Sequence, residues 1–255
     1  MMVIILVYLF ILGMVLGSFY NVVASRLPKN ESIISPGSHC ENCNHKLTWY
    51  ELIPVFSYIF QGGKCSKCKI KLSILYPLSE LVTGILFVLS YVIFGASYQM
   101  LMSLVVVSVV VITVISDFKY MVILDEPIII GSIMISILLF FDGGLVYLGN
   151  SMFHGIVLLV IMVLIKLFGD KLFKRESLGW GDVKLSFLAG LLLGVRLGAV
   201  YIFLSSVIAL PYAIYITCRK KDSVVPFGPF LAISMLIIYW NSSFVFKILG
   251  YLLGV

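Results

Sequence analysis

"LVTGILFVLSYVIFGASYQMLMSLVVVSVVVITVIS", residues 81–116, is a run of 36 residues that contains no acidic or basic side chain. A helix that crosses a membrane needs about 20 predominantly apolar residues. The run is therefore long enough for two crossings, and we expect the chain to turn between them near residues 95–97. Such a pattern is typical of a protein that is surrounded by lipid.

The composition of the whole chain supports the same class of protein. Hydrophobic residues make up 61% of the 255 residues, charged residues make up 12%, and the mean hydropathy is +1.13, which excludes a single water-soluble core. We expect an all-α polytopic membrane protein with about eight transmembrane helices. The expected helices cover residues 2–24, 77–95, 98–116, 127–141, 151–168, 181–196, 198–218 and 228–252. The last of them contains Asn241 and Lys247, so we expect it to break or to end early.

The basic residues predict the orientation of the chain in the membrane. If the N-terminus lies outside and every expected helix crosses, all of the 18 lysines and arginines except Arg196 and Lys247 lie on the cytoplasmic side. The basic residues of the first helix follow it, so it is not a cleavable signal peptide. We interpret the net charge of +6 as this bias, together with attraction to membrane lipids. No basic patch carries interleaved aromatic residues, so we expect no nucleic acid partner.

Four of the five cysteines lie in one polar segment between the first two expected helices. They form two Cys-x2-Cys pairs, Cys40 with Cys43 and Cys65 with Cys68, and such pairs typically bind one zinc ion. Two disulfides are the alternative, but thiols stay reduced in the cytoplasm. Four protein ligands leave no open position for water, so we expect a structural zinc ion. The expected domains are residues 1–25, a first transmembrane helix; 26–76, a cytoplasmic zinc-binding domain; and 77–255, a transmembrane core of about seven helices.

Two of the acidic residues that border the expected helices are candidates for catalysis. Asp117 ends the third helix, and Asp182 begins the sixth directly after a Gly-Trp-Gly turn. Two carboxyl groups held together can share one proton, which suits water-activated cleavage of a peptide bond. Helix capping and a cation site remain alternatives for this pair. The other acids have local interpretations: Asp125 as an N-cap, Glu80 as a first-turn partner of a helix dipole, Asp142 as a turn residue and Asp170 as a solvated charge.

Six motifs, in order along nearly the whole chain, resemble the type IV prepilin peptidases, a family of membrane aspartic peptidases. They are "GSFYNVVASRLP" (17–28), the tetracysteine segment, "LIPVFSYIFQGGKCSKCKIKLSILYPLSELVTGILF" (52–87), "DFKYMVILDEP" (117–127), "GWGDVKLSFLAGLLLG" (179–194) and "PFGPFLA" (226–232). The chain departs from the family pattern at Leu124, where the family has proline after the first aspartate, and at Leu75, where it has arginine. The proline loss puts the geometry of the loop after Asp117 in question.

The resemblance implies that Asp117 and Asp182 are the catalytic pair and that Gly179, Gly181, Lys184, Asp125 and Gly228 support them. It implies a bacterial plasma membrane enzyme that cleaves the basic leader of a type IV prepilin or pilin-like protein, after glycine, at the cytoplasmic face. Relatives with the tetracysteine domain commonly also methylate the new N-terminus with S-adenosylmethionine. Glu80 and Gly63 are the candidates for methyl transfer.

The roles of the two aspartates and the function class keep alternatives open. Because Asp182 begins a helix and Asp117 ends one, the helix dipoles predict that Asp182 is the resting base and Asp117 holds the proton. The alternatives to a bifunctional enzyme are a peptidase without methylation, a non-enzymatic assembly factor that contains zinc, and a transporter. Transporters usually carry paired sites near the middle of the membrane, whereas these acids lie at one face.

Overall fold

The computed structural model describes residues 2–219 and 225–253, and in these ranges it contains helices, turns and only two isolated β-bridges. The all-α class expected from the sequence is confirmed. The chain forms two compact units, residues 1–95 and 96–255. Each unit is described by itself below.

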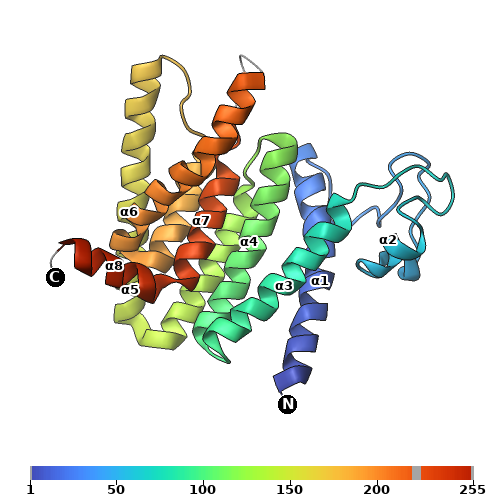
Figure 1. Cartoon of the computed structure of the whole chain (residues 1–255), viewed down its shortest axis with the longest axis horizontal. Helices are drawn as coiled ribbons and strands as arrows, with labels where there is room; N and C mark the ends of the chain where they lie inside the picture. Colours follow the sequence, from blue (N-terminus) through green and yellow to red (C-terminus); the bar gives the residue numbers. More distant parts are fainter. Residues whose placement is uncertain (1, 220–224, 254–255) are drawn as a thin grey trace. The chain divides into compact units, whose positions relative to one another are not determined.

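The N-terminal unit contains two long helices and a small irregular domain that lies between them in the sequence (Figure 1). The long helices are α1 (Met2–Arg26) and α3 (Leu75–Phe94). Short elements lie between them: η1 (Leu27–Lys29), η2 (Trp49–Leu52) and α2 (Phe56–Phe60).

Glycines bring α1 and α3 close together. A Cβ atom on Gly13 would lie 2.7 Å from the Cα atom of Gly84, and one on Gly17 would lie 2.9 Å from the Cα atom of Glu80. Gly13 and Gly17 are four residues apart and so face the same side of α1, as in the small-residue interfaces by which helices pack in membranes. Helix α3 is thus part of the N-terminal unit.

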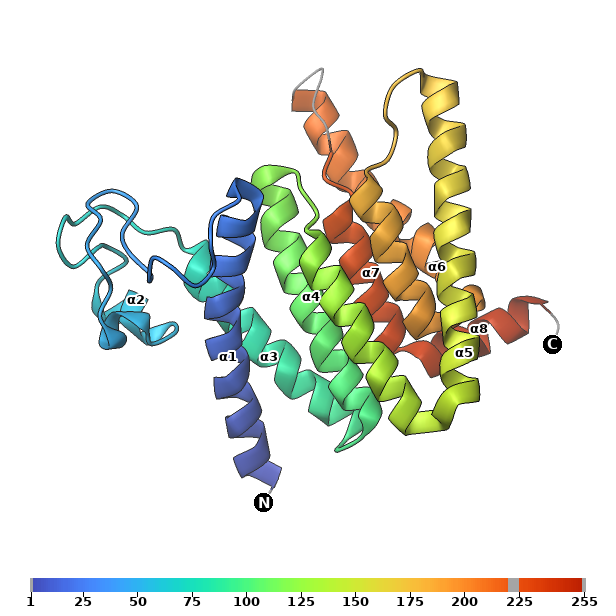
Figure 2. The same ribbon diagram turned by 180° about the vertical axis from the view of Figure 1, so that it is seen from behind.

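The C-terminal unit consists of α4 (Tyr98–Tyr120), α5 (Asp125–Phe173), α6 (Trp180–Arg219), α7 (Gly228–Trp240) and α8 (Ser242–Leu253). Helices α5 and α6 are each interrupted by one glycine outside the helical region, Gly144 with φ 74° and Gly194 with φ 73°. This left-handed conformation costs little only for glycine. The chain reverses direction at both glycines (Figures 1 and 2).

Among the described residues, five helices are long and apolar enough to cross a membrane, or six if α7 and α8 count as one bent span. Helices α5 and α6 each contain two of the expected spans; the break at Gly144 lies between the two spans of α5, whereas the break at Gly194 lies two residues before the expected end of the first span of α6. The last expected span breaks at Asn241, where α7 and α8 meet at 85°, so the expectation of a break is confirmed. The basic residues Lys220 and Lys221 lie outside the described residues.

Three helix ends lie at the same end of the C-terminal unit (Figure 2). They are the C-terminal end of α4, the N-terminal end of α6 and the N-terminal end of α7. Buried apolar side chains of α5, α6 and α7 hold these helices together, among them Leu158, Leu188 and Met235. A Cβ atom added to Gly190 of α6 would lie 2.9 Å from the Cα atom of Gly155 in α5. Helices α5 and α6 therefore pack closely at this point. The rigid packing fixes where the helix ends meet.

Candidate active site and metal centre

Asp117 lies in the last turn of α4 and is only 5% exposed. Its Oδ2 atom accepts a hydrogen bond of 3.2 Å from the backbone N–H of Gly228, which is the first residue of α7. Sequence separation between the two partners is 111 residues. The carboxyl group is therefore buried against a helix N-terminus, where the backbone stabilises negative charge.

Asp182 lies in the first turn of α6 and is also 5% exposed. Its Oδ2 atom accepts a hydrogen bond of 3.2 Å from the backbone N–H of Gly179, whereas Oδ1 is buried and has no hydrogen-bond partner among the described residues. The fold brings the carboxyl groups of Asp182 and Asp117 close enough to interact electrostatically. Buried polar atoms almost always have a partner, so the orphaned Oδ1 atom marks a place where a ligand or water belongs.

Asp182 begins α6 and Asp117 ends α4, as expected, but Asp117 also lies at the start of a second helix. The N-terminus of α7 donates to Asp117 in the same way that the turn before α6 donates to Asp182. At Asp117 the dipole of α7 favours the anion and the dipole of α4 disfavours it, so the dipole of α4 alone does not assign the proton to Asp117.

Ile123 is the residue that connects the two halves of the site. A Cβ atom on Gly181 would lie 2.5 Å from the Cβ atom of Ile123, and one on Gly228 would lie 2.5 Å from its Cδ1 atom. Both distances are far below ordinary carbon contact, which begins at about 3.5 Å. Ile123 thus packs between two glycines, one beside each aspartate, and neither glycine has room for a side chain.

Two other expected supporting residues, Lys184 and Asp125, contact each other. Lys184 and Asp125 form an ion pair of 2.6 Å with each other, and both side chains are half exposed. The N-cap of α5 is Leu124 and not Asp125, which is the first helical residue, so the N-cap interpretation of Asp125 is wrong. Leu124 has φ −78°, within the range that proline imposes. Its backbone thus has the conformation that the family's proline would give.

A buried lysine near Asp182 was missed from the sequence. Lys166 of α5 is 2% exposed, and its Nζ atom donates to the carbonyl oxygen of Leu178 at 2.6 Å and pairs with Asp170 at 3.2 Å. The same Nζ atom lies 5.3 Å from the ring centre of Trp180. These contacts hold residues 178–180, which form the turn before Asp182, against α5. The sequence signal was a lysine near the end of an apolar helix with an acid four residues later.

Two acids have local contacts that can be compared with their expected roles. Asp170 is a helical residue that accepts from the N–H and hydroxyl groups of Ser177, at 2.6 and 2.8 Å, and so orders the loop before α6. Its side chain is 29% exposed, so Asp170 is partly solvated, as expected, and it also holds this loop. Asp142 precedes the break in α5, as expected of a turn residue, and accepts from the side chain of Gln99.

The four cysteines of the N-terminal unit form a cluster. Their Sγ atoms all lie within 4.8 Å of one another, with Cys40 and Cys68 at 3.8 Å and Cys43 and Cys65 at 3.9 Å. Zinc–sulfur bonds of about 2.3 Å in a tetrahedron place sulfur atoms about 3.8 Å apart. The four thiols are unbridged, so the disulfide alternative is contradicted, and the group is able to hold a metal ion.

The two Cys-x2-Cys pairs have the same local structure. In the first, Asn44 N–H donates to Cys40; in the second, Lys69 N–H donates to Cys65. Both donors have positive φ, 54° and 60°. Each pair is closed by an isolated β-bridge, His39 to Lys46 and Lys64 to Lys71. The repeat explains how two short loops present four sulfur atoms to one point.

Glu51 is a buried carboxylate beside this cluster. Its Oε2 atom accepts from the N–H and hydroxyl groups of Thr48, both at 2.8 Å, and contacts His45 at 3.2 Å. Although burial raises the pKa of Glu51, hydrogen bonds from Ser66, Thr48 and His45 outweigh it and lower the pKa to about 2. Glu51 therefore joins residues that border both cysteine pairs.

Glu80 and Gly63, the candidates for methyl transfer, also have structural contacts. Helix α3 begins at Leu75, so Glu80 is not in its first turn and the dipole interpretation is wrong. Glu80 is buried, and its Oε2 atom accepts from the N–H group of Val55 at 2.7 Å. Gly63 has φ 67° and lies against the ring of Tyr58, so its turn requires glycine.

Comparisons with known proteins cover both units. The Bacterial Peptidase A24 N-terminal domain matches residues 11–94, and the Type IV leader peptidase family matches residues 104–214. Relatives named "Prepilin leader peptidase/N-methyltransferase" include one from Bacillus subtilis, 35% identical over 91% of this chain and 92% of the relative. Others are from Vibrio cholerae, 31% identical over 91% and 94%, and Neisseria gonorrhoeae, 30% identical over 93% and 91%. No solved structure matches the chain. The chain belongs to the type IV leader peptidase family.

Proposed function

We propose that the chain is a prepilin leader peptidase that cleaves the basic leader of type IV prepilins or pilin-like proteins after glycine and then methylates the new N-terminus. The family and the names of its relatives support both activities. The observation that carries the proposal is the pair of buried carboxyl groups, Asp117 and Asp182, each held by a backbone N–H of a glycine. The Oδ1 atom of Asp182 has no partner in the part of the chain that the structure describes.

The chemistry requires one proton between the two carboxyl groups. Two interacting acids in a poorly solvated site hold a shared proton because ionising both is costly. The ionised member takes a proton from water, whose oxygen attacks the carbonyl carbon of the scissile peptide, while the protonated member donates a hydrogen bond to the carbonyl oxygen. The tetrahedral intermediate collapses, the C–N bond breaks, and the amine takes up a proton.

Orientation supports the same substrate. We propose eight crossings: one each by α1, α3, α4 and α7, and two each by α5 and α6, one in each half. The N-terminus then lies outside, and the enzyme lies in the bacterial plasma membrane. Asp117 and Asp182 then lie on the cytoplasmic side, where the basic leader of a prepilin is found. The proposed domains are residues 1–25, 26–76 and 77–255.

The cofactors that we propose are zinc and S-adenosylmethionine. Cys40, Cys43, Cys65 and Cys68 would hold the zinc ion, and its contribution is to fold the segment between α1 and α3. S-adenosylmethionine supplies the methyl group, as the names of the relatives suggest. Glu80 and Gly63 remain candidates for that site.

The test is the intact mass of a prepilin with a Gly-Phe junction after co-expression. The wild-type enzyme should remove the leader, and Asp117→Asn and Asp182→Asn should each abolish cleavage. A pilin that carries an additional methyl group shows the second activity. The matched control is Asp142→Asn, which changes an acid outside the pair and outside its supporting residues and should retain cleavage. Cleavage by the double variant of Asp117 and Asp182 would contradict the mechanism.

A further inference from the structure

The segment between the two cysteine pairs has an unusually apolar surface. Residues 52–60, "LIPVFSYIF", contain no charge, and residues 47–63 contain only Glu51, which is buried. Large side chains of this segment are nevertheless exposed, with Trp49 at 78% and Phe60 at 85%. The other exposed members are Leu52, Ile53, Phe56 and Ile59. A contiguous apolar surface of this kind marks contact with a membrane or another protein.

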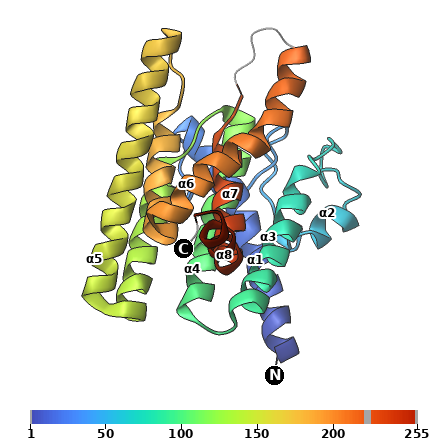
Figure 3. The ribbon, with the colours of Figure 1, turned by 60° about the vertical axis from the view of Figure 1, so that its left-hand side comes forward.

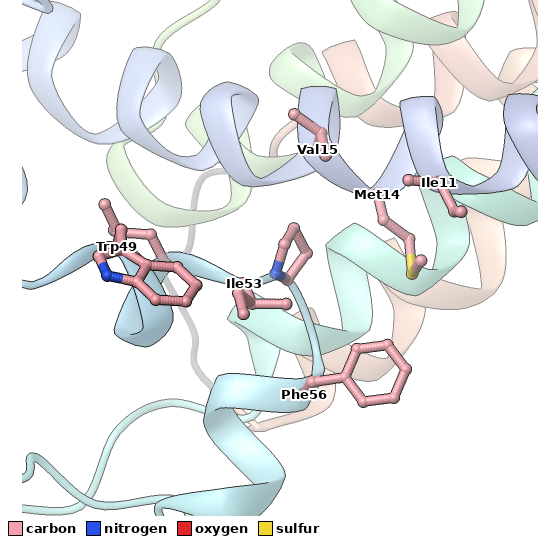
Figure 4. A pocket seen from close by; sticks show the side chains of 8 residues that line it. Ile11, Met14, Val15, Trp49, Ile53 and Phe56 are labelled. Atoms are coloured by element: carbon pink, nitrogen blue, oxygen red, sulfur yellow. The ribbon is translucent and has the colours of Figure 1, made fainter.

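The same segment lines a pocket of about 400 Å³ together with α1 (Figure 4). Trp49, Ile53 and Phe56 lie on one side of the pocket, and Ile11 and Val15 of α1 on the other. Residues Ile11 and Val15 are themselves about half exposed within a helix that is apolar enough to cross a membrane. The exposed surface of the segment is therefore continuous with the lipid-facing surface of α1.

The position along α1 gives the depth of the segment. Helix α1 ends at Arg26, whose guanidinium group donates to carbonyl oxygens of the following loop and so marks the polar boundary. At about 1.5 Å per residue, Val15 lies about 16 Å and Ile11 about 22 Å from Arg26 along the helix axis. The hydrocarbon core of a bilayer is about 30 Å thick. Residues that line the pocket together with Ile11 and Val15 are therefore at the level of the acyl chains.

Irregular backbone at this depth must have its polar groups satisfied, because lipid offers no hydrogen bonds. The N–H group of Val55 has no helical partner, since Val55 has φ 64° and precedes α2. The buried carboxylate of Glu80 accepts this N–H group at 2.7 Å. At the start of α2, the backbone N–H group of Ser57 donates to the carbonyl oxygen of Ile53, and that of Ile59 donates to the carbonyl oxygen of Val55. The position of Glu80 on α3 thus supplies an acceptor where the segment needs one.

We propose that Trp49 and the uncharged residues 52–60 insert into the leaflet on the Arg26 side of the membrane, with lipid acyl chains in the pocket between them and α1, while Glu51 stays with the cysteine loops. Figures 1 and 3 show α2 at the level of the middle part of α1 and not beyond its end. The cysteine pairs, flanked by the exposed lysines Lys46, Lys64, Lys67, Lys69 and Lys71, remain at the headgroup level, where anionic lipids attract basic residues. The proposal depends only on α1 crossing the membrane and not on the catalytic mechanism.

The test measures the depth of single tryptophans in the full-length protein reconstituted in phosphatidylcholine and phosphatidylglycerol vesicles. In a Trp180→Phe and Trp240→Phe background, Trp49 is the only tryptophan. Adding Trp49→Phe permits two further variants, Phe56→Trp in the segment and Lys67→Trp in a cysteine loop as the matched control. Lipids brominated on the acyl chain should strongly quench the fluorescence of Trp49 and that of the Phe56→Trp variant. Aqueous acrylamide should quench only the Lys67→Trp control.

A measurement on the unsubstituted chain keeps the proposal testable if these variants fail to fold. A lipid with a photoactivatable group near the end of its acyl chain should label peptides that contain residues 49–60 as it labels α1, and should leave the cysteine loops unlabelled. Acrylamide quenching at position 56 equal to that at position 67, without lipid labelling, would overturn the proposal. Protection of the segment from both lipid and acrylamide would also overturn it, because a second copy of the chain would then cover the surface.

Discussion

Replacing Gly228 by alanine is the sharpest test of how the site is held together. Its added Cβ atom would lie 2.5 Å from the Cδ1 atom of Ile123 and 2.8 Å from Oδ2 of Asp117. Rotation about the Cβ–Cγ1 bond of Ile123 moves its Cδ1 atom, but the added Cβ atom would still lie 2.9 Å from Cγ1 of Ile123. We therefore expect the new methyl group to displace Asp117 and to weaken its hydrogen bond from the backbone N–H of residue 228.

The magnitude follows from these distances. Carbon atoms make contact at about 3.5 to 4.0 Å, so the groups around residue 228 must separate by about 1 Å. Overpacking of this kind costs about 1 to 3 kcal/mol of stability, and a misplacement of about 1 Å reduces catalysis by about 100-fold. Gly228 does not have positive φ, so alanine introduces a steric conflict and no backbone strain.

The assay is prepilin cleavage in proteoliposomes, with kcat/KM and thermal unfolding measured for each variant. The control is Gly149→Ala, where an added Cβ meets nothing within 4 Å and should leave activity unchanged. Ile123→Ala removes the Cδ1 atom and should partly rescue Gly228→Ala. It should not rescue Gly181→Ala, because the conflicting atom there is the Cβ atom, which alanine retains. Wild-type activity of Gly228→Ala, or equal rescue of both glycine variants, would refute the reasoning.

Other parts of the structure give further predictions. Lys166→Met should lower the kcat/KM of cleavage by about 10-fold or more, because charge-assisted hydrogen bonds contribute about 1.5 to 3 kcal/mol. The control Lys171→Met changes an exposed lysine and should leave kcat/KM unchanged. Equal kcat/KM values for these two variants would contradict a positioning role for Lys166. Glu51→Gln should increase the rate at which a chelator removes zinc by about 10-fold, as is common for groups that orient metal ligands, and zinc release followed with a colorimetric chelator checks this. The lowered pKa of Glu51 means that its stabilisation is present above pH 4.5 and is lost as the pH falls towards about 2. Between these two pH values the wild type should therefore lose more stability than Glu51→Gln, as measured by unfolding at each pH, and parallel losses in the two proteins would contradict the assignment.

The sequence was sufficient to predict the helical class, because apolar runs of membrane length have a strong signal that needs no tertiary information. It also predicted the breaks: Gly144 lies in a Gly-Gly pair, and Asn241 interrupts an apolar stretch. The tetracysteine cluster was predictable because ligand spacing within each pair is local. These features depend on residues close together in the chain.

The contacts of the candidate site were harder to predict because they join distant segments. Nothing near Asp117 in the chain indicates that its partner is the N–H group of Gly228, so the dipole argument could not take the N-terminus of α7 into account. Lys166 was counted only among the cytoplasmic basic residues, because its partners Leu178 and Asp170 lie beyond the expected end of its span, whereas α5 continues to Phe173. The position of Glu80 was misjudged for the same reason, since helix boundaries decide which side chains become buried.

Backbone contacts also explain which departures from the family pattern the site tolerates. Both carboxyl groups are held by N–H groups of the main chain, at Gly228 and Gly179, and not by side chains that a substitution would remove. Leucine at position 124 is therefore compatible with the geometry of the site, because its φ is one that proline would impose and those N–H groups stay in place. A glycine has no such latitude, since any side chain at 181 or 228 would collide with Ile123. We infer that the space around Ile123, more than the residue type in the loop, limits variation at this site.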